Sequence, residues 1–141
     1  METITKSAKE TFEVGRKIGS SLKGSEILAL VGELGAGKTT FIQGLANGMG
    51  IKNKIVSPTF ILMRSYEGEK LTLYHLDLYR LEGDIKTQVK ELGIDDFWGR
   101  NDNVTVVEWA DKSKEVFPEK TIWINFEKIN EDERKITAEG I

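Results

Sequence analysis

The sequence contains no cysteine and a single histidine, His75. A zinc site built from cysteine and histidine ligands and a framework of disulfides are therefore both excluded. The lack of cysteine also fits a reducing cytoplasm. A chain of 141 residues buries roughly two-thirds of the surface that it exposes when unfolded, so it needs neither disulfides nor a structural metal to fold.

Long apolar runs and basic stripes are missing too. Residues 1–10 lack the apolar region of a signal peptide, and no window approaches the roughly 20 apolar residues that span a bilayer. The net charge is −3 and acidic and basic residues are interspersed, whereas proteins that bind nucleic acid tightly carry a basic surface. We therefore expect a cytoplasmic protein that contacts no membrane and meets nucleic acid only within a complex.

What is present is the composition of one globular domain, 39% hydrophobic and 30% charged. A helix is predicted over about 8–22, where Ser7 and Glu10 form a capping box, and two more are predicted over 40–49 and 85–92. Strands are predicted over residues 27–31, 61–66, 71–77, 104–108, 121–126 and 135–139.

The kinds of strand indicate the fold. The unbroken apolar run at 27–31 is typical of a strand buried on both faces of a parallel sheet. Residues 61–66 with 71–77, and 121–126 with 135–139, read as antiparallel hairpins. We predict that residues 1–141 form a single α/β domain of the P-loop NTPase type. Its mixed sheet has a parallel core, antiparallel additions and flanking helices, and the site lies at the carboxyl ends of the central strands.

A phosphate-binding loop follows the first predicted buried strand. Residues 32–39, Gly-Glu-Leu-Gly-Ala-Gly-Lys-Thr, match the pattern G-x-x-x-x-G-K-[ST] at every defined position. Glycines let the backbone approach phosphate oxygens, and successive N–H groups form an anion nest. Lys38 should reach the β- and γ-phosphates, and the Thr39 hydroxyl should ligate Mg²⁺. We expect a nucleoside triphosphate to contact Glu33, Leu34, Gly35, Ala36, Gly37, Lys38, Thr39 and Thr40.

Two acidic residues close predicted strands. P-loop hydrolases use such an acid to orient Mg²⁺ and the attacking water from the side opposite the loop. Glu108 follows the more apolar strand, which makes it the better candidate for a metal ligand, and Asp77 is then the candidate for positioning water. The alternative for either acid is a solvated strand end.

Other polar and aromatic residues leave two interpretations open. Residues 57–60, Ser-Pro-Thr-Phe, fit either a loop that senses the γ-phosphate or an ordinary turn. A lone histidine in an apolar strand, such as His75, is more often a hydrogen-bonded core residue than a catalyst. Arg80 fits either transition-state stabilisation or a surface ion pair, and Trp98 and Trp109 fit either packing or stacking on a base or partner.

Four blocks together resemble the bacterial TsaE family, formerly called YjeE: residues 32–41, 57–60, 75–81 and 107–111. Residues 7–15 are similar to its amino-terminal helix, so the resemblance covers essentially the whole chain. It implies an ATPase that depends on Mg²⁺ and is needed for N6-threonylcarbamoyladenosine at position 37 of tRNAs reading codons that start with adenine. Its partner would be the TsaB–TsaD heterodimer, and tRNA would be contacted only indirectly.

The resemblance also implies roles for single residues. Lys38 would hold phosphate, Thr39 and Glu108 would ligate Mg²⁺, and Asp77 would be a switch residue near the γ-phosphate. The sequence shows no obvious arginine finger in cis, so slow hydrolysis by the protein alone and stimulation by its partners are expected.

By resemblance, Thr11 in the amino-terminal helix would border the nucleotide. On a looser pattern, so would Arg134 or Lys135 in the last hairpin. Two other functional classes remain at this point. One is a small-molecule kinase, although no arginine-rich lid is visible. The other is a nucleotide-gated interaction module that barely hydrolyses ATP.

Overall fold

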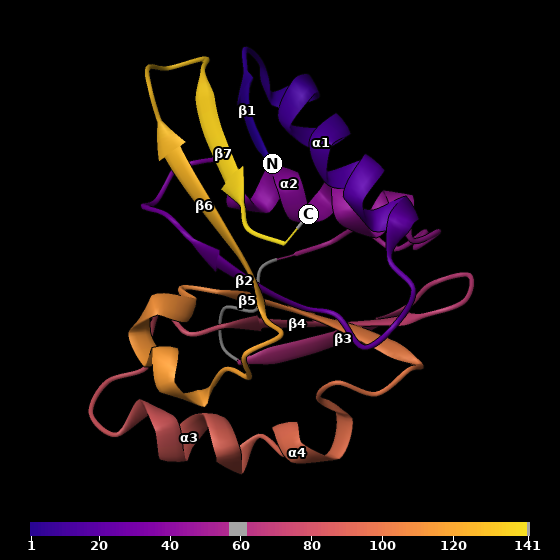
Figure 1. The fold of residues 1–141 in the computed structure, drawn as a ribbon, viewed down its shortest axis with the longest axis vertical. Coiled ribbons are helices and arrows are strands. Elements are labelled where there is room, and N and C mark those ends of the chain that lie inside the picture. Colours follow the sequence, from indigo (N-terminus) through magenta and orange to yellow (C-terminus); the bar gives the residue numbers. More distant parts are fainter. Residues whose placement is uncertain (57–61, 141) are drawn as a thin grey trace.

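A seven-stranded mixed sheet runs through the protein (Figure 1). In this computed structural model, which describes residues 1–56 and 62–140, the strand order is β1-β7-β6-β2-β5-β4-β3. The strands are β1 (Glu2–Thr5), β2 (Ile27–Val31), β3 (Met63–Glu67), β4 (Thr72–Asp77), β5 (Asn103–Glu108), β6 (Ile122–Lys128) and β7 (Arg134–Ala138). The predicted loop at 57–60 lies outside the described residues.

The four central strands are parallel. β2 pairs with both β6 and β5, and β5 pairs with β4, all in parallel. The outer pairs β3–β4, β6–β7 and β1–β7 are antiparallel. The prediction of a parallel core with antiparallel additions is therefore confirmed. As a result, the carboxyl ends of β2, β5 and β4 meet at one edge, where ligands bind in sheets of this kind.

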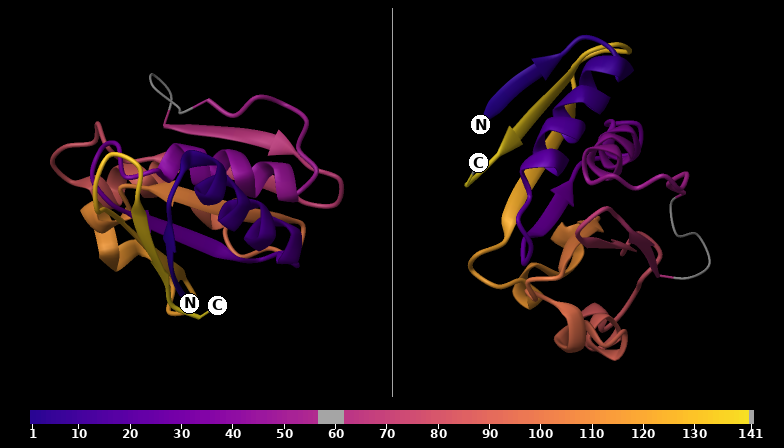
Figure 2. Two further views of the ribbon diagram at one scale, coloured as in Figure 1. Left: turned by 90° about the horizontal axis from the view of Figure 1, so that it is seen from above. Right: turned by 90° about the vertical axis from the view of Figure 1, so that its right-hand side faces the viewer.

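Helices cover both faces of the sheet (Figures 1 and 2). α1 (Ala8–Ser21) and α2 (Lys38–Gly48) lie on one face. α3 (Ile85–Glu91), α4 (Ile94–Phe97) and the 3₁₀ helix η1 (Ala110–Val116) lie on the other. A hydrophobic cluster lies on each face of the sheet, and β2 contributes to both. Leu28 and Leu30 pack with α2 on one face, whereas Ala29 belongs to the cluster on the opposite face.

Four glycines lie where α1 crosses α2, spaced four residues apart on each helix: Gly15 and Gly19 on α1, and Gly44 and Gly48 on α2. A Cβ atom at any of them would stand 2.0 to 2.2 Å from a backbone carbonyl oxygen of the other helix. The two backbones are therefore in direct contact. This packing fixes the amino-terminal end of α1 beside the first turn of α2.

The long predicted elements are present, with ends that move by a few residues. α2 begins at Lys38, inside the 32–39 motif, rather than near 40, because Gly37 in the left-handed region is its N-cap. In the capping box, Ser7 accepts from the N–H of Glu10 as predicted, but the Glu10 carboxylate accepts from Lys6 N. No helix in the described part of the chain is long and apolar enough to cross a membrane.

Candidate functional site

The loop between β2 and α2 has the shape that its sequence predicts. Gly35 and Gly37 have φ values of +80° and +96°, in the left-handed region that side chains disfavour. Gly37 is the N-cap of α2, and no side chain caps the helix. The amino-terminal turn of α2 therefore presents backbone N–H groups and the positive end of the helix dipole, both of which favour an anion.

Lys38 is the buried cation of this loop. Its Nζ donates to the carbonyl oxygen of Gly32 and lies 3.9 Å from the centre of the Trp109 ring. Burial lowers the pKa of Lys38, while the carboxylates of Glu108 and Asp77 act in the opposite direction. An ammonium group held this way, next to the start of α2, is placed to exchange its carbonyl partner for a phosphate oxygen.

Asp77 and Glu108 end neighbouring parallel strands and are paired in register. Burial raises the pKa of Asp77, the N–H of Tyr79 lowers it by donating to Oδ1 at 3.0 Å, and the charge of Glu108 raises it further. Glu108 is only 4% exposed. The two acids that the sequence singles out are therefore brought together at the carboxyl edge of the sheet.

Side chains at this edge of the sheet offer oxygen donors, the kind of ligand that Mg²⁺ takes. Within residues 1–56 and 62–140, no group of three or more His, Cys, Asp or Glu side chains could hold a metal ion. Mg²⁺ is usually bound through one or two protein oxygens, with waters and substrate phosphates filling the other positions. Thr39 and Glu108 could supply those oxygens, because both line the same cleft.

That cleft has a volume of about 370 Å³, within the range of small-molecule sites. It is lined by Leu34, Gly35, Gly37, Lys38, Thr39, Thr40, Asp77, Tyr79, Glu108, Trp109 and Arg134. Most of the predicted site residues are among them. Glu33 and Ala36 are not: Glu33 is exposed and Ala36 lies in the core.

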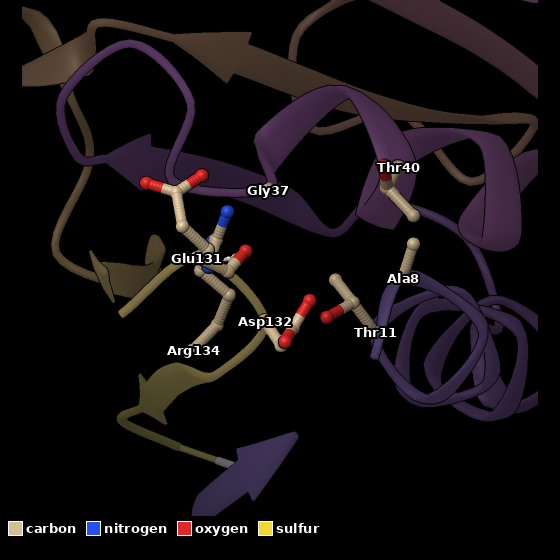
Figure 3. Close-up of a pocket in the computed structure, with 7 residues that line it drawn as sticks. All are labelled: Ala8, Thr11, Gly37, Thr40, Glu131, Asp132 and Arg134. Atoms are coloured by element: carbon tan, nitrogen blue, oxygen red, sulfur yellow. Dashed lines mark hydrogen bonds between the residues drawn. The ribbon is translucent and has the colours of Figure 1, made fainter. Parts of the chain in front are cut away.

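A smaller hollow of about 150 Å³ adjoins the cleft on the side of α1 (Figure 3). It shares Gly37, Thr40 and Arg134 with the cleft. Its other lining residues are Ala8, Thr11, Glu131 and Asp132. Thr11, predicted to border the nucleotide, lines this hollow, although its hydroxyl is buried against that of Thr5, with 2.7 Å between the oxygens.

Arg134 connects the last hairpin to the phosphate-binding loop. Its Nε donates to the carbonyl oxygen of Gly35 at 3.1 Å. Its Nη1 donates to carbonyl oxygens of the β6–β7 turn, those of Asn130, Glu131 and Glu133. The guanidinium group therefore holds two loops together at the border of the cleft, in addition to any contact with a ligand.

The sequence did not identify Tyr79 and Trp109 as site residues, although both line the cleft. Their rings are in contact in a tilted arrangement, with 4.9 Å between centroids and 40° between the ring planes. Trp109 has a φ of +57°, uncommon for a bulky residue. Their position in the sequence could have identified them, because each lies within two residues after an acidic residue that ends a strand. Trp98 instead packs on Phe117 in the core, and Arg80 is not among the residues that line either hollow.

The chain is similar to known proteins in both sequence and fold. The family described as "Threonylcarbamoyl adenosine biosynthesis protein TsaE" matches residues 5–136. Relatives named "tRNA threonylcarbamoyladenosine biosynthesis protein TsaE" are 37% identical in Bacillus subtilis (97% of this chain and 84% of the relative) and 37% identical in Treponema pallidum (98% and 99%). The crystal structure of YdiB from Bacillus subtilis superposes with a TM-score of 0.80 at 34% identity, covering 98% of this chain and 83% of that one.

Proposed function

This chain belongs to the TsaE family, and from that premise we propose that it is a Mg²⁺-dependent ATPase required to form the threonylcarbamoyl group on adenosine 37 of tRNA. The relatives are named as proteins of tRNA threonylcarbamoyladenosine biosynthesis. The observation that supports the ATPase most directly is one cleft in which Lys38 and Thr39 of the loop face Asp77 and Glu108 of the strand ends.

Each residue of the cleft would have a role in ATP hydrolysis that follows from its chemistry. Lys38 and the backbone of the loop would bind the β- and γ-phosphates, and the Thr39 hydroxyl and the Glu108 carboxylate would hold Mg²⁺. The metal ion, when bound, neutralises charge that develops on the phosphate oxygens. Asp77 would orient the attacking water. Because burial raises the pKa of Asp77, its carboxylate is a better proton acceptor than an exposed one.

Hydrolysis by the protein alone is expected to be slow. The only arginine that lines the cleft in the described part of the chain is Arg134, and its guanidinium group is bonded to backbone carbonyls. A P-loop hydrolase without an arginine finger turns over at roughly 10⁻⁴ to 10⁻³ s⁻¹. We propose that the TsaB–TsaD heterodimer either supplies a positively charged group to the phosphates or orders the loop that carries Asp77.

Exposed apolar side chains beside the cleft support a partner at that position. Leu34, on the phosphate-binding loop, is 69% exposed, and Tyr79 is 45% exposed. Both line the nucleotide cleft. A partner that covers them would bury apolar surface and at the same time exclude water from the phosphates.

The proposal is tested by measuring ATP hydrolysis by the wild type and by Glu108→Ala, each alone and with a TsaB–TsaD pair. Stimulation of the wild type that disappears in the variant supports both the partner and the metal-ligand role. If the wild type binds ATP but neither associates with the pair nor responds to it, the role in tRNA modification is wrong, whereas the nucleotide site remains. Phosphorylation of a metabolite in place of phosphate release would instead identify a kinase.

A further inference from the structure

The single histidine is joined to the candidate metal ligand in the interior of the sheet. Nε2 of His75 lies 2.8 Å from Oε2 of Glu108, and the two side chains are 1% and 5% exposed. His75 lies opposite Val106 on β5, so its ring reaches along the strand to the end, where Glu108 stands. His75 is absent from the residues that line the cleft, whereas Glu108 is among them.

The surroundings of the ring indicate which nitrogen donates. Nδ1 of His75 is buried and has no hydrogen-bond partner among the described residues. A proton on Nδ1 would therefore be an unsatisfied buried donor, which costs free energy. The neutral tautomer with its proton on Nε2 avoids this cost and donates that proton to the Glu108 carboxylate.

We propose that His75 is a positioning residue that fixes the Glu108 carboxylate for the metal ion of the bound nucleotide. The inference rests on the proposed function, since it needs a nucleotide-bound metal. A glutamate side chain has three rotatable bonds, and one hydrogen bond to Oε2 restricts the plane of the carboxylate. The other carboxylate oxygen of Glu108 would then already be oriented toward the metal when the metal binds. Partners of this kind, one step removed from a metal, typically change metal affinity by about 10- to 100-fold when they are lost.

The test measures binding of Mn²⁺, in place of Mg²⁺, to the protein in the presence of ADP, from the electron paramagnetic resonance signal of free Mn²⁺. Binding of ADP in EDTA is measured in parallel. His75→Leu removes the donor, and His75→Gln carries an amide N–H at a similar distance from the backbone. The matched control is Thr105→Val on β5, because Thr105 is fully buried and its hydroxyl has no partner among the described residues.

The expected result is that His75→Leu weakens Mn²⁺ affinity by about tenfold or more, while ADP affinity in EDTA is unchanged. His75→Gln should recover most of the loss, and Thr105→Val should behave as the wild type. If His75→Leu fails to fold, the comparison moves to His75→Asn, whose shorter amide cannot reach Glu108, against His75→Gln. A larger loss in the asparagine variant is then expected.

Two results overturn the inference alone: unchanged Mn²⁺ affinity in a folded variant without the donor, or an equal loss of ADP affinity with and without metal, which marks a purely structural role. A wild type that binds ADP equally well with and without Mn²⁺ would instead contradict the metal dependence of the proposed function, and the inference with it. The wild-type measurement therefore separates the two failures.

Discussion

The Nζ of Lys38 lies 3.9 Å from the centre of the Trp109 ring and donates to the carbonyl oxygen of Gly32. The cation that should hold phosphate is thus engaged by its own loop and by an aromatic face. A cation over an aromatic ring gains about 0.5 to 2 kcal/mol, whereas each hydrogen bond to a charged group such as phosphate contributes about 1.5 to 3 kcal/mol. Binding of a nucleotide should therefore draw Lys38 away from Trp109.

Tryptophan fluorescence should report this exchange. We expect ADP with Mg²⁺ to change the emission of Trp109, because the charge above its ring moves. The chain has three tryptophans, and of these Trp109 lines the cleft whereas Trp98 and Trp123 do not. A variant with Trp98→Phe and Trp123→Phe should keep the change on titration, and Trp109→Phe should lose it. Persistence of the full signal in Trp109→Phe would refute the assignment.

The contact between α1 and α2 should make Gly44→Ala destabilising. Alanine normally stabilises a helix by about 1 kcal/mol relative to glycine. Here the new Cβ would stand 2.0 Å from the carbonyl oxygen of Phe12, and overpacking of this kind costs about 1 to 3 kcal/mol or more. After the helix-propensity gain is subtracted, urea unfolding should show a net loss of about 1 to 2 kcal/mol. Ser20→Ala, on the exposed side of α1, is the control and should change little.

Asp77 should make stability depend on pH in a direction opposite to that of most acids. Burial raises the pKa of Asp77, so the folded state binds its proton more tightly than the unfolded state. Stability is therefore lost as pH rises from the ordinary aspartate pKa, about 3.9, through the raised value. Asp77→Asn should raise the Tm at neutral pH, and the gain should vanish toward about pH 4.

The control for this prediction is Asp84→Asn. Hydrogen bonds from Thr87 lower the pKa of Asp84, so ionised Asp84 favours the folded state and its loss should lower the Tm at neutral pH, with the difference again disappearing in acid. A Tm that falls in both variants at neutral pH would show that burial is not the dominant influence on Asp77.

The hydrogen bonds of Arg134 predict that the last hairpin supports the nucleotide loop. Arg134→Met should release Gly35 from the β6–β7 turn, lowering stability by about 1 to 2 kcal/mol and weakening ADP binding severalfold. Lys135→Met is the matched control, because its ion pair with Glu2 lies at the surface. Calorimetry and ADP titration would check both effects. ADP affinity equal to that of the wild type in Arg134→Met would count against support of the loop.

The parts of the site that the sequence predicts are those with a local signature. The strand at 27–31 is predicted to the residue, because a run of apolar residues reflects burial on both faces. The glycine loop is predicted because each glycine meets a local demand of the backbone. Asp77 and Glu108 emerge because both end strands, and parallel pairing brings such ends together.

The parts that were missed depend on distant contacts. β1 has four residues and pairs only with β7, where Glu2 lies opposite Thr137. α4 is a single turn whose Phe97 stacks on Tyr74 of β4 at 4.2 Å. The sequence of neither segment indicates which distant strand it contacts. The left-handed backbone of Trp109 is unpredictable for the same reason, since local preference opposes it and only the surrounding structure holds it.

The pairing of the first strand with the last has a consequence for the order of folding. Thr5 on β1 lies opposite Arg134 on β7, and Arg134 is the residue that joins the hairpin to the phosphate-binding loop. Synthesis proceeds from the amino terminus, so α1, β2 and the loop are made long before their partners at 134–138. Closing such a distant contact is entropically expensive and slow. On these grounds we expect the nucleotide cleft to be among the last regions to form. A chain interrupted before residue 134 would carry the complete phosphate-binding sequence without Arg134, which lines the cleft.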